Sequence, residues 1–183
     1  MLSELTDDER ASLLRQLDDK LKAYCPGLTA EVGESTPSGR KLVFSAEGDT
    51  DLFRFVIDLV DSAPDVDWWE FVAFKQPLGK GLKVRFDKFL FDTRHMFFQQ
   101  LECEEEPDML GLRVAVPGND PEDDDFQVGV YVTIEALIGE FVCATRLGYL
   151  ETADLPKEPF KEGYKPLDDL PDFVEWFIQK SDA

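Results

Sequence analysis

The sequence predicts an α+β fold in which helices pack on a mostly antiparallel sheet. Hydrophobic residues make up 43% of the 183 residues and aromatic residues 12%, which is enough for one sizeable core. Short extended runs alternate with helical stripes along the chain. The order hairpin, helix, strand occurs in residues 28–74 and again in residues 95–150. We therefore expect two ββαβ halves that share one sheet, in a single globular domain spanning residues 1–183.

An N-terminal helix is expected within residues 1–25. Thr6 and Glu9 have the spacing of a capping box, in which each side chain accepts from the backbone amide of the other residue. An apolar stripe follows at three- and four-residue steps, and Pro26 and Gly27 end it. The stripe consists of Leu14, Leu17, Leu21 and Tyr24. The helix is therefore amphipathic and lies on a larger body.

The core of the domain is expected in residues 26–150. Residues 28–33 and 41–45 have the pattern of a hairpin, and Pro37 and Gly39 mark its connection. A helix from residue 48 to 60 has apolar residues on more than one face, so we expect it to be largely buried and central to the fold. Further strands are expected at residues 68–74, 82–86, 95–101 and 110–116.

Residues 126–138 have two interpretations. Pro121 suits the first position of a helix, and Phe126, Val130 and Ile134 continue a helical stripe, which favours a helix. Residues 126–132 also alternate at period two, so a strand followed by a short helix is the alternative.

The last part of the chain is expected to return to the core. Residues 141–150 have the pattern of a strand, and residues 151–183 form an irregular segment followed by a helix at 171–180. This helix is too apolar for a free tail, so we expect it to dock on the core and its removal to destabilise the fold.

The composition excludes several classes of function. The chain has 19 basic and 39 acidic residues, a net charge of -20, so it repels nucleic acid and anionic lipid. Every apolar run is interrupted well short of the ~18 residues that a membrane helix needs. Cys25, Cys103 and Cys143 form no CxxC pair and the N-terminus has no signal-peptide pattern, so a cytoplasmic protein is expected. We read Cys25 and Cys143 as small core residues.

An acidic stretch runs from Glu102 to Asp125. Its carboxylates would attract a basic partner, although acids at a helix N-terminus are also expected simply because the helix dipole favours them. The calcium-loop pattern fails, because the sixth position counted from Asp120 is an aspartate and the twelfth is Tyr131. The candidate partner-binding residues are Glu104, Glu105, Glu106, Glu122, Asp123, Asp124 and Asp125.

Residues 75–94 are the one basic segment of the chain. Its spacing around Gly79 and Gly81 is not that of a phosphate-binding loop. The cations either neutralise the acidic surface of the protein itself or bind an anionic ligand. The candidate ligand-binding residues are Lys80, Lys83, Arg85, Arg94 and His95.

Catalytic and cofactor signatures are absent from the sequence. His95 is the only histidine, which excludes a two-histidine metal site, and no metal or cofactor is expected. No serine-hydrolase, zinc-protease, dinucleotide or kinase motif occurs. This weakens the case for an enzyme and leaves it open. The three tryptophans and many phenylalanines are expected in the core, and only an exposed cluster would indicate a binding surface.

Two stretches carry a resemblance to a known family. They are LFRFVIDLVDSAP at residues 52–64, leading into WEFVAFKQP at 69–77, and IGEF at 138–141 with the run up to Tyr149. Over about residues 40–150 the chain resembles an uncharacterised bacterial domain family of unknown function. The resemblance implies a bacterial α+β protein and brings no activity or site with it.

Two functions are therefore in competition. The leading hypothesis is a non-enzymatic acidic protein, of the inhibitor or immunity type, that engages a basic protein partner. The alternative is a small enzyme or small-molecule sensor that binds an anionic ligand near residues 75–94.

Overall fold

The computed structural model describes residues 6–36, 39–102 and 108–181 and confirms the α+β class. Its contacts divide the chain into two compact units, residues 1–75 and 76–183, and each is described by itself. The single domain over residues 1–183 stays a prediction. The described strands form three sheets, so the expectation of one shared sheet is wrong.

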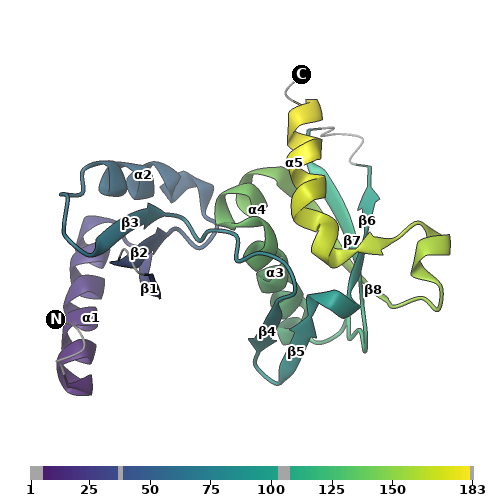
Figure 1. The fold of residues 1–183 in the computed structure, drawn as a ribbon, viewed down its shortest axis with the longest axis horizontal. Coiled ribbons are helices and arrows are strands. Elements are labelled where there is room, and N and C mark those ends of the chain that lie inside the picture. The colour runs from purple at the N-terminus through teal and green to yellow at the C-terminus, as the bar shows by residue number, and fades with distance from the viewer. Residues whose placement is uncertain (1–5, 37–38, 103–107, 182–183) are drawn as a thin grey trace. The chain divides into compact units, whose positions relative to one another are not determined.

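Unit 1 is the first ββαβ half (Figure 1). Strands β1 and β2 form an antiparallel hairpin, and β3 pairs with β2 in parallel after the crossover through α2. The strand order is β1-β2-β3. The elements are α1 (Asp7–Tyr24), β1 (Thr29–Thr36), β2 (Gly39–Ser45), the 3-10 turn η2 (Thr50–Leu52), α2 (Phe53–Asp61) and β3 (Trp69–Ala73).

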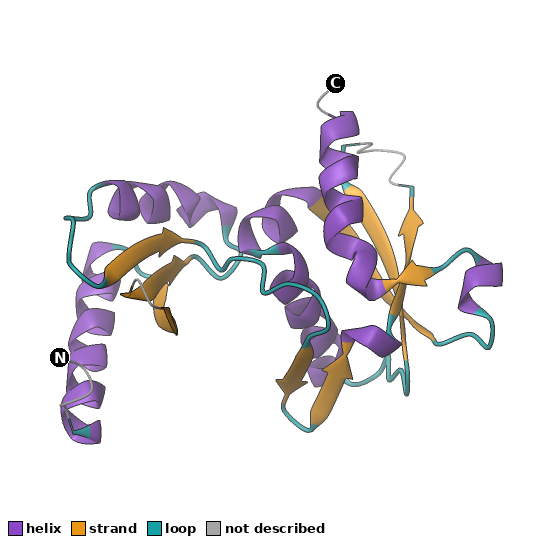
Figure 2. Cartoon of the chain, in the orientation of Figure 1, coloured by secondary structure: helices purple, strands orange, loops and turns teal. Residues whose placement is uncertain are grey.

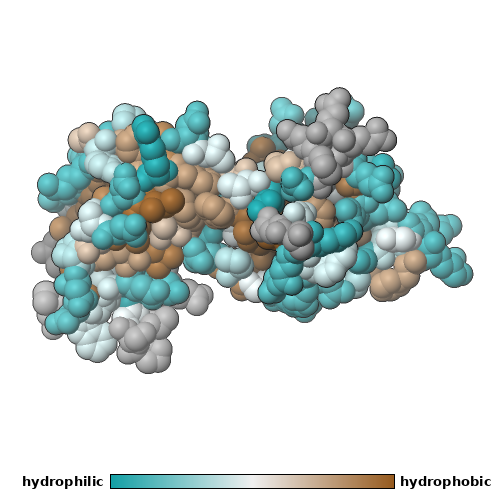
Figure 3. All heavy atoms as spheres, turned by 90° about the horizontal axis from the view of Figure 1, so that it is seen from above, coloured by the Kyte–Doolittle hydropathy of each residue, from teal (hydrophilic) through white to brown (hydrophobic). Residues whose placement is uncertain are grey.

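Helix α2 is less buried than its sequence predicts. Within it only Phe53 and Val56 are buried, and Ile57 is 40% exposed. Figure 3, which looks down on α2, shows hydrophobic residues at the surface of unit 1. The prediction of a largely buried, central helix is therefore wrong, because a small three-stranded sheet covers only one stripe of the helix. Phe53 anchors that stripe against Phe74, with ring centroids 4.5 Å apart.

Unit 2 contains the second ββαβ half (Figure 2). Strands β6 and β7 are antiparallel, and β8 returns in parallel to β7 after two helices. The short strand β9 extends this sheet to the order β8-β7-β6-β9, and β4 and β5 form a separate hairpin. The strands are β4 (Lys83–Phe86), β5 (Phe89–Asp92), β6 (Phe97–Leu101), β7 (Leu110–Val116), β8 (Leu147–Asp154) and β9 (Lys165–Pro166). The helices are η3 (Thr93–His95), α3 (Asp124–Ile138), α4 (Glu140–Arg146), η4 (Pro159–Glu162), η5 (Leu167–Asp169) and α5 (Leu170–Ser181).

Helix α3 forms the centre of unit 2. It also decides between the two interpretations of residues 126–138, a helix or a strand followed by a short helix. The segment is helical throughout, so the strand alternative is wrong. Phe126, Val130, Ile134 and Leu137 are all buried, as the helical stripe predicts. The core joins α3 to β6, β7 and α5.

Two short elements differ from the sequence prediction. Residues 140–146 form helix α4, so the strand expected from residue 141 begins only at Leu147. Gly139, at φ 82°, breaks α3 and lets a new helix start, and a short apolar run does not distinguish helix from strand. Strand β5 was not expected. Its two-residue connection to β4 is made possible by Asp87, at φ 48°.

The C-terminal helix is confirmed. α5 spans Leu170–Ser181 and buries Leu170, Val174 and Phe177. Within the described part of the chain, no single helix has both the length and the apolar character needed to cross a membrane.

Candidate functional site

The described part of the acidic stretch lies at the start of α3. Asp123 caps the helix by accepting from the backbone N–H of Asp125 at 3.0 Å and of Phe126 at 3.2 Å. It also accepts from Lys88 Nζ at 2.6 Å, and this pairing holds the pKa of Asp123 below its ordinary value. Asp123 therefore has a structural role.

The neighbours of Asp123 differ from it in their contacts. Glu122, Asp124 and Asp125 are exposed, and within the described chain none of them forms an ion pair. The other three candidates, Glu104, Glu105 and Glu106, lie outside the described residues. The structure thus places four of the seven predicted acids together and assigns one of them to capping.

Most cations of the basic segment are paired with carboxylates of the same chain. Lys80 Nζ lies 2.8 Å from Asp172 and Lys83 Nζ 3.6 Å from Asp92. Arg94 donates to both oxygens of Asp92, at 2.8 and 2.5 Å. These hydrogen bonds hold the pKa of Asp92 far below its ordinary value.

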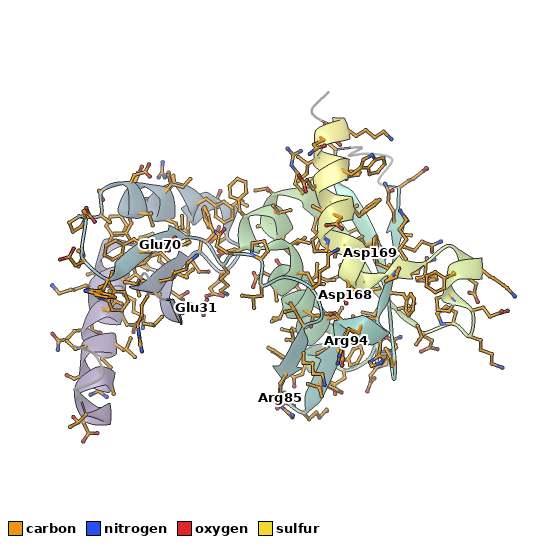
Figure 4. The ribbon with its side chains drawn as sticks, in the orientation of Figure 1. Glu31, Glu70, Arg85, Arg94, Asp168 and Asp169 are labelled. Atoms are coloured by element: carbon orange, nitrogen blue, oxygen red, sulfur yellow. The ribbon has the colours of Figure 1, made fainter. Side chains whose placement is uncertain are left out.

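Arg85 and His95 complete the predicted ligand set. Figure 4 shows Arg85 on the β4–β5 hairpin, apart from Arg94. Arg85 is exposed and forms no ion pair in the described part of the chain. The imidazole of His95 is 71% exposed, and its Nδ1 lies 3.7 Å from the Asp92 carboxylate. The five predicted residues therefore do not converge on a common point, and Asp92 is the group that three of them approach.

The glycine turn that precedes these cations is also occupied. Asp168 Oδ1 accepts from the Gly81 N–H at 2.9 Å and from the buried Thr93 hydroxyl at 2.6 Å. An anion bound at this turn would compete with Asp168 for that amide. The geometry supports the interpretation that residues 75–94 neutralise acids of the protein itself.

The described cysteines are core residues, as predicted. Cys25 and Cys143 are free and buried. Burial raises the pKa of Cys143 to about 11, so its thiol stays protonated near neutral pH and is a poor nucleophile. Among the described residues, no cluster of three or more His, Cys, Asp or Glu side chains is arranged to hold a metal ion.

A polar cluster also crosses the sheet of unit 2. Arg113 on β7 donates to Glu151 on β8, and Tyr149 Oη donates to the other oxygen of Glu151 at 2.8 Å. These hydrogen bonds lower the pKa of Glu151. The Arg113 and Glu151 charges neutralise each other across paired strands, and such cross-strand pairs usually stabilise a sheet.

Sequence reasoning missed a hollow in unit 1 beside Trp68. Trp68 is 71% exposed, although the sequence predicts a strand that begins at this residue. The turn before β3 is held by a bridge between Val66 and Trp69, so Trp68 lies outside the ladder. The available signal was the grouping of Asp65, Asp67 and Glu70 around two tryptophans, and it does not reveal that Trp68 is exposed. The hollow is lined by Gly39, Asp65, Val66, Asp67, Trp68, Trp69 and Glu70.

Comparison with known proteins adds no function. No family model, curated protein or solved structure matches the chain, which is consistent with the resemblance to an uncharacterised family of unknown function.

Proposed function

We propose that this chain is a non-enzymatic acidic binding protein that engages a basic surface of another protein, as inhibitors and immunity proteins do. The observation that carries the proposal is the unequal pairing of charges. The cations of residues 75–94 are largely paired internally, whereas Glu122, Asp124 and Asp125 remain exposed without an ion pair in the described chain.

The physical advantage of this arrangement is electrostatic. A net charge of -20 attracts a basic partner over about a Debye length, ~10 Å at 0.1 M salt. Carboxylates that already have internal partners contribute less, because their field is partly cancelled. The unpaired acids at the start of α3 are therefore the part of unit 2 best suited to a basic surface.

A catalytic role has less support. His95 is exposed and approaches Asp92, which Arg94 already holds, while the described thiols are buried. A nucleophile is activated by a base within hydrogen-bond reach, and among the described residues His95 approaches a carboxylate and no hydroxyl or thiol.

We further infer a reducing compartment such as the bacterial cytoplasm. Two buried free thiols, Cys25 and Cys143, are typical of proteins that fold where disulfides do not form.

The test is affinity capture from a lysate of the organism that encodes the chain, with elution by increasing salt and identification by mass spectrometry. Three baits are compared. The first is the wild type, and the second, the acid variant, carries Glu122→Gln, Asp124→Asn and Asp125→Asn and keeps the Asp123 cap. The third, the control variant, carries Asp19→Asn, Asp58→Asn and Asp61→Asn, which remove the same charge from exposed helix positions.

The proposal predicts a basic protein that the wild type and the control variant retain and that the acid variant releases at lower salt. Equal retention by all three baits would show that the acidic stretch keeps the protein soluble and does not bind the partner. Recovery of no specific partner would contradict the proposed function.

A further inference from the structure

Trp68 is exposed to an unusual degree for a tryptophan in a folded unit. It is 71% exposed, against 50% for Trp176, and it borders the hollow before β3. Burying an indole ring is strongly favourable, so a ring left in water is a candidate contact for another molecule.

The ring is carried by a rigid turn. The Trp68 carbonyl accepts from the Arg40 N–H at 2.8 Å, and the Trp69 N–H donates to Val66 at 3.0 Å. Gly39 packs so closely that a Cβ there would lie 2.5 Å from the Trp68 oxygen. The peptide group between Trp68 and Trp69 is therefore held by two hydrogen bonds, which reduces the backbone entropy lost when a ligand binds.

The charges that line the hollow favour the binding of a cation. The described residues that line it include three carboxylates, Asp65, Asp67 and Glu70, and no lysine or arginine. Glu70 has a distant partner, since Lys41 Nζ lies 3.6 Å away and both side chains are exposed. Within the described chain, Asp65 and Asp67 form no ion pair.

The rings elsewhere in the chain provide an independent comparison. Lys180 lies over Trp176, with its Nζ 5.3 Å from the ring centroid. Arg54 covers Phe55 at 4.5 Å, and Lys88 covers Phe89 at 4.9 Å. Among the described residues, no cation of the chain covers Trp68. Trp68, the most exposed indole of the described chain, therefore has a ring face that no cation of the described residues occupies.

We propose that the Trp68 hollow, defined by Asp65, Asp67, Trp68 and Glu70, receives an arginine side chain of the basic protein partner. The guanidinium stacks on the indole face while its N–H groups donate to the carboxylates. Arginine fits better than lysine, because its planar group can stack and donate at the same time. This inference rests on the proposed function and gives it a specific contact in unit 1.

The test is a titration of the full chain with a capped peptide of alternating glycine and arginine. Two matched peptides replace arginine by lysine or by citrulline, which keeps the shape of arginine and loses its charge. Binding is followed by calorimetry and by the indole N–H signals of the three tryptophans in an NMR spectrum. We expect the Trp68 signal to shift with the arginine peptide, to shift less with the lysine peptide and to stay in place with the citrulline peptide.

Two variants remove the site. Trp68→Ala removes the ring, and a double variant with Asp65→Asn and Asp67→Asn removes two charges. Their controls are Trp176→Ala, another exposed tryptophan, and the double variant Asp58→Asn with Asp61→Asn, which has the same net charge. We expect each site variant to weaken binding of the arginine peptide at least about fivefold, and each control less than about twofold.

The outcomes separate this inference from the proposed function. If the site variants bind like their controls while the acid variant of α3 binds more weakly, the hollow is not the contact and the proposed function stands. If neither the site variants nor the acid variant differs from its controls, both proposals fail. Because the indole signal is measured in the wild type, a variant that failed to fold would leave the inference testable. An unmoved Trp68 signal at saturation overturns it.

Discussion

Gly129 shows at the residue scale how one missing side chain sets the packing of unit 2. A Cβ on Gly129 would lie 2.3 Å from Phe91 Cε2 and 3.1 Å from Phe86 Cβ. The glycine therefore lets the β4–β5 hairpin approach α3 more closely than alanine would. The sequence offered no reason for a glycine inside a helix, because the reason is a ring that belongs to another element.

Gly129→Ala is expected to destabilise the protein although alanine is the better helix former. The gain in helix propensity is about 1 kcal/mol, whereas overpacking a tight core costs about 1–3 kcal/mol. Urea unfolding measures the difference. The neighbouring Val128→Ala, at a position 45% exposed, is the control and should change the unfolding free energy little. A more stable Gly129→Ala protein would show that Phe91 moves away freely.

The lowered pKa of Asp92 should make the stability of the fold depend on pH. Its hydrogen bonds from Arg94 lower its pKa in the folded state below the ordinary value of 3.8. The ionised Asp92 therefore stabilises the fold above about pH 3.8, and this stabilisation is lost as the pH falls through the lower, folded-state pKa. Asp92→Asn should lower the urea midpoint at pH 7, and the gap from the wild type should narrow below pH 4. An equal gap at pH 7 and pH 3 would contradict the assignment.

The site was only partly predictable at this scale. The exposed acids Glu122, Asp124 and Asp125 could be found from sequence, because charge density alone marks them. The exposure of Trp68 could not, because it depends on a turn that removes the residue from the strand. The ion pair between Lys80 and Asp172 could not be predicted either, because it joins residues far apart in the sequence.

At the scale of elements, a long periodic segment is predicted more securely than a short apolar run. The apolar stripe of α3 continues through a helix of 15 residues and identifies that helix. Helix α4 and strand β5 are short, so their patterns fit either structure. Their geometry comes from positive φ angles at Gly139 and Asp87, which no periodicity reveals.

Helix α5 is expected to be essential for unit 2. Deleting residues 170–181 exposes the surface that Leu170, Val174 and Phe177 cover, at about 1.5–3 kcal/mol for each side chain. That loss is comparable with the whole stability of an ordinary domain. We expect the truncated chain to lose the part of its near-ultraviolet circular dichroism that comes from unit 2.

A milder variant tests the same contact. Phe177→Ala should cost about 3–5 kcal/mol in urea unfolding, and Glu175→Ala, on the exposed side of α5, should cost little. Native-like stability after the truncation or after Phe177→Ala would show that α5 is not part of the core.

At the scale of the whole molecule, the repeated order of elements was visible in the sequence and the separation of the sheets was not. Both halves have an antiparallel pair followed by a parallel crossover. Which strands become neighbours depends on contacts between distant residues, so the order of elements left open whether the halves share a sheet.

Unit 2 is expected to fold without unit 1, because its hydrophobic core is formed by residues 76–183 alone. A fragment of these residues should unfold cooperatively in urea and show dispersed NMR signals. A fragment with the collapsed spectrum of an unfolded chain would mean that unit 2 needs unit 1 to fold, as one domain over residues 1–183 requires.

The most direct test of the central claim is the dissociation constant of the captured basic partner, measured at low and at physiological salt for three proteins. These are the wild type, the acid variant of α3 and the charge-matched control variant. We predict that the acid variant binds more weakly than the control and that its affinity depends less on salt, because fewer charges attract the partner. Equal affinities and equal salt dependence for the acid and control variants would contradict the account.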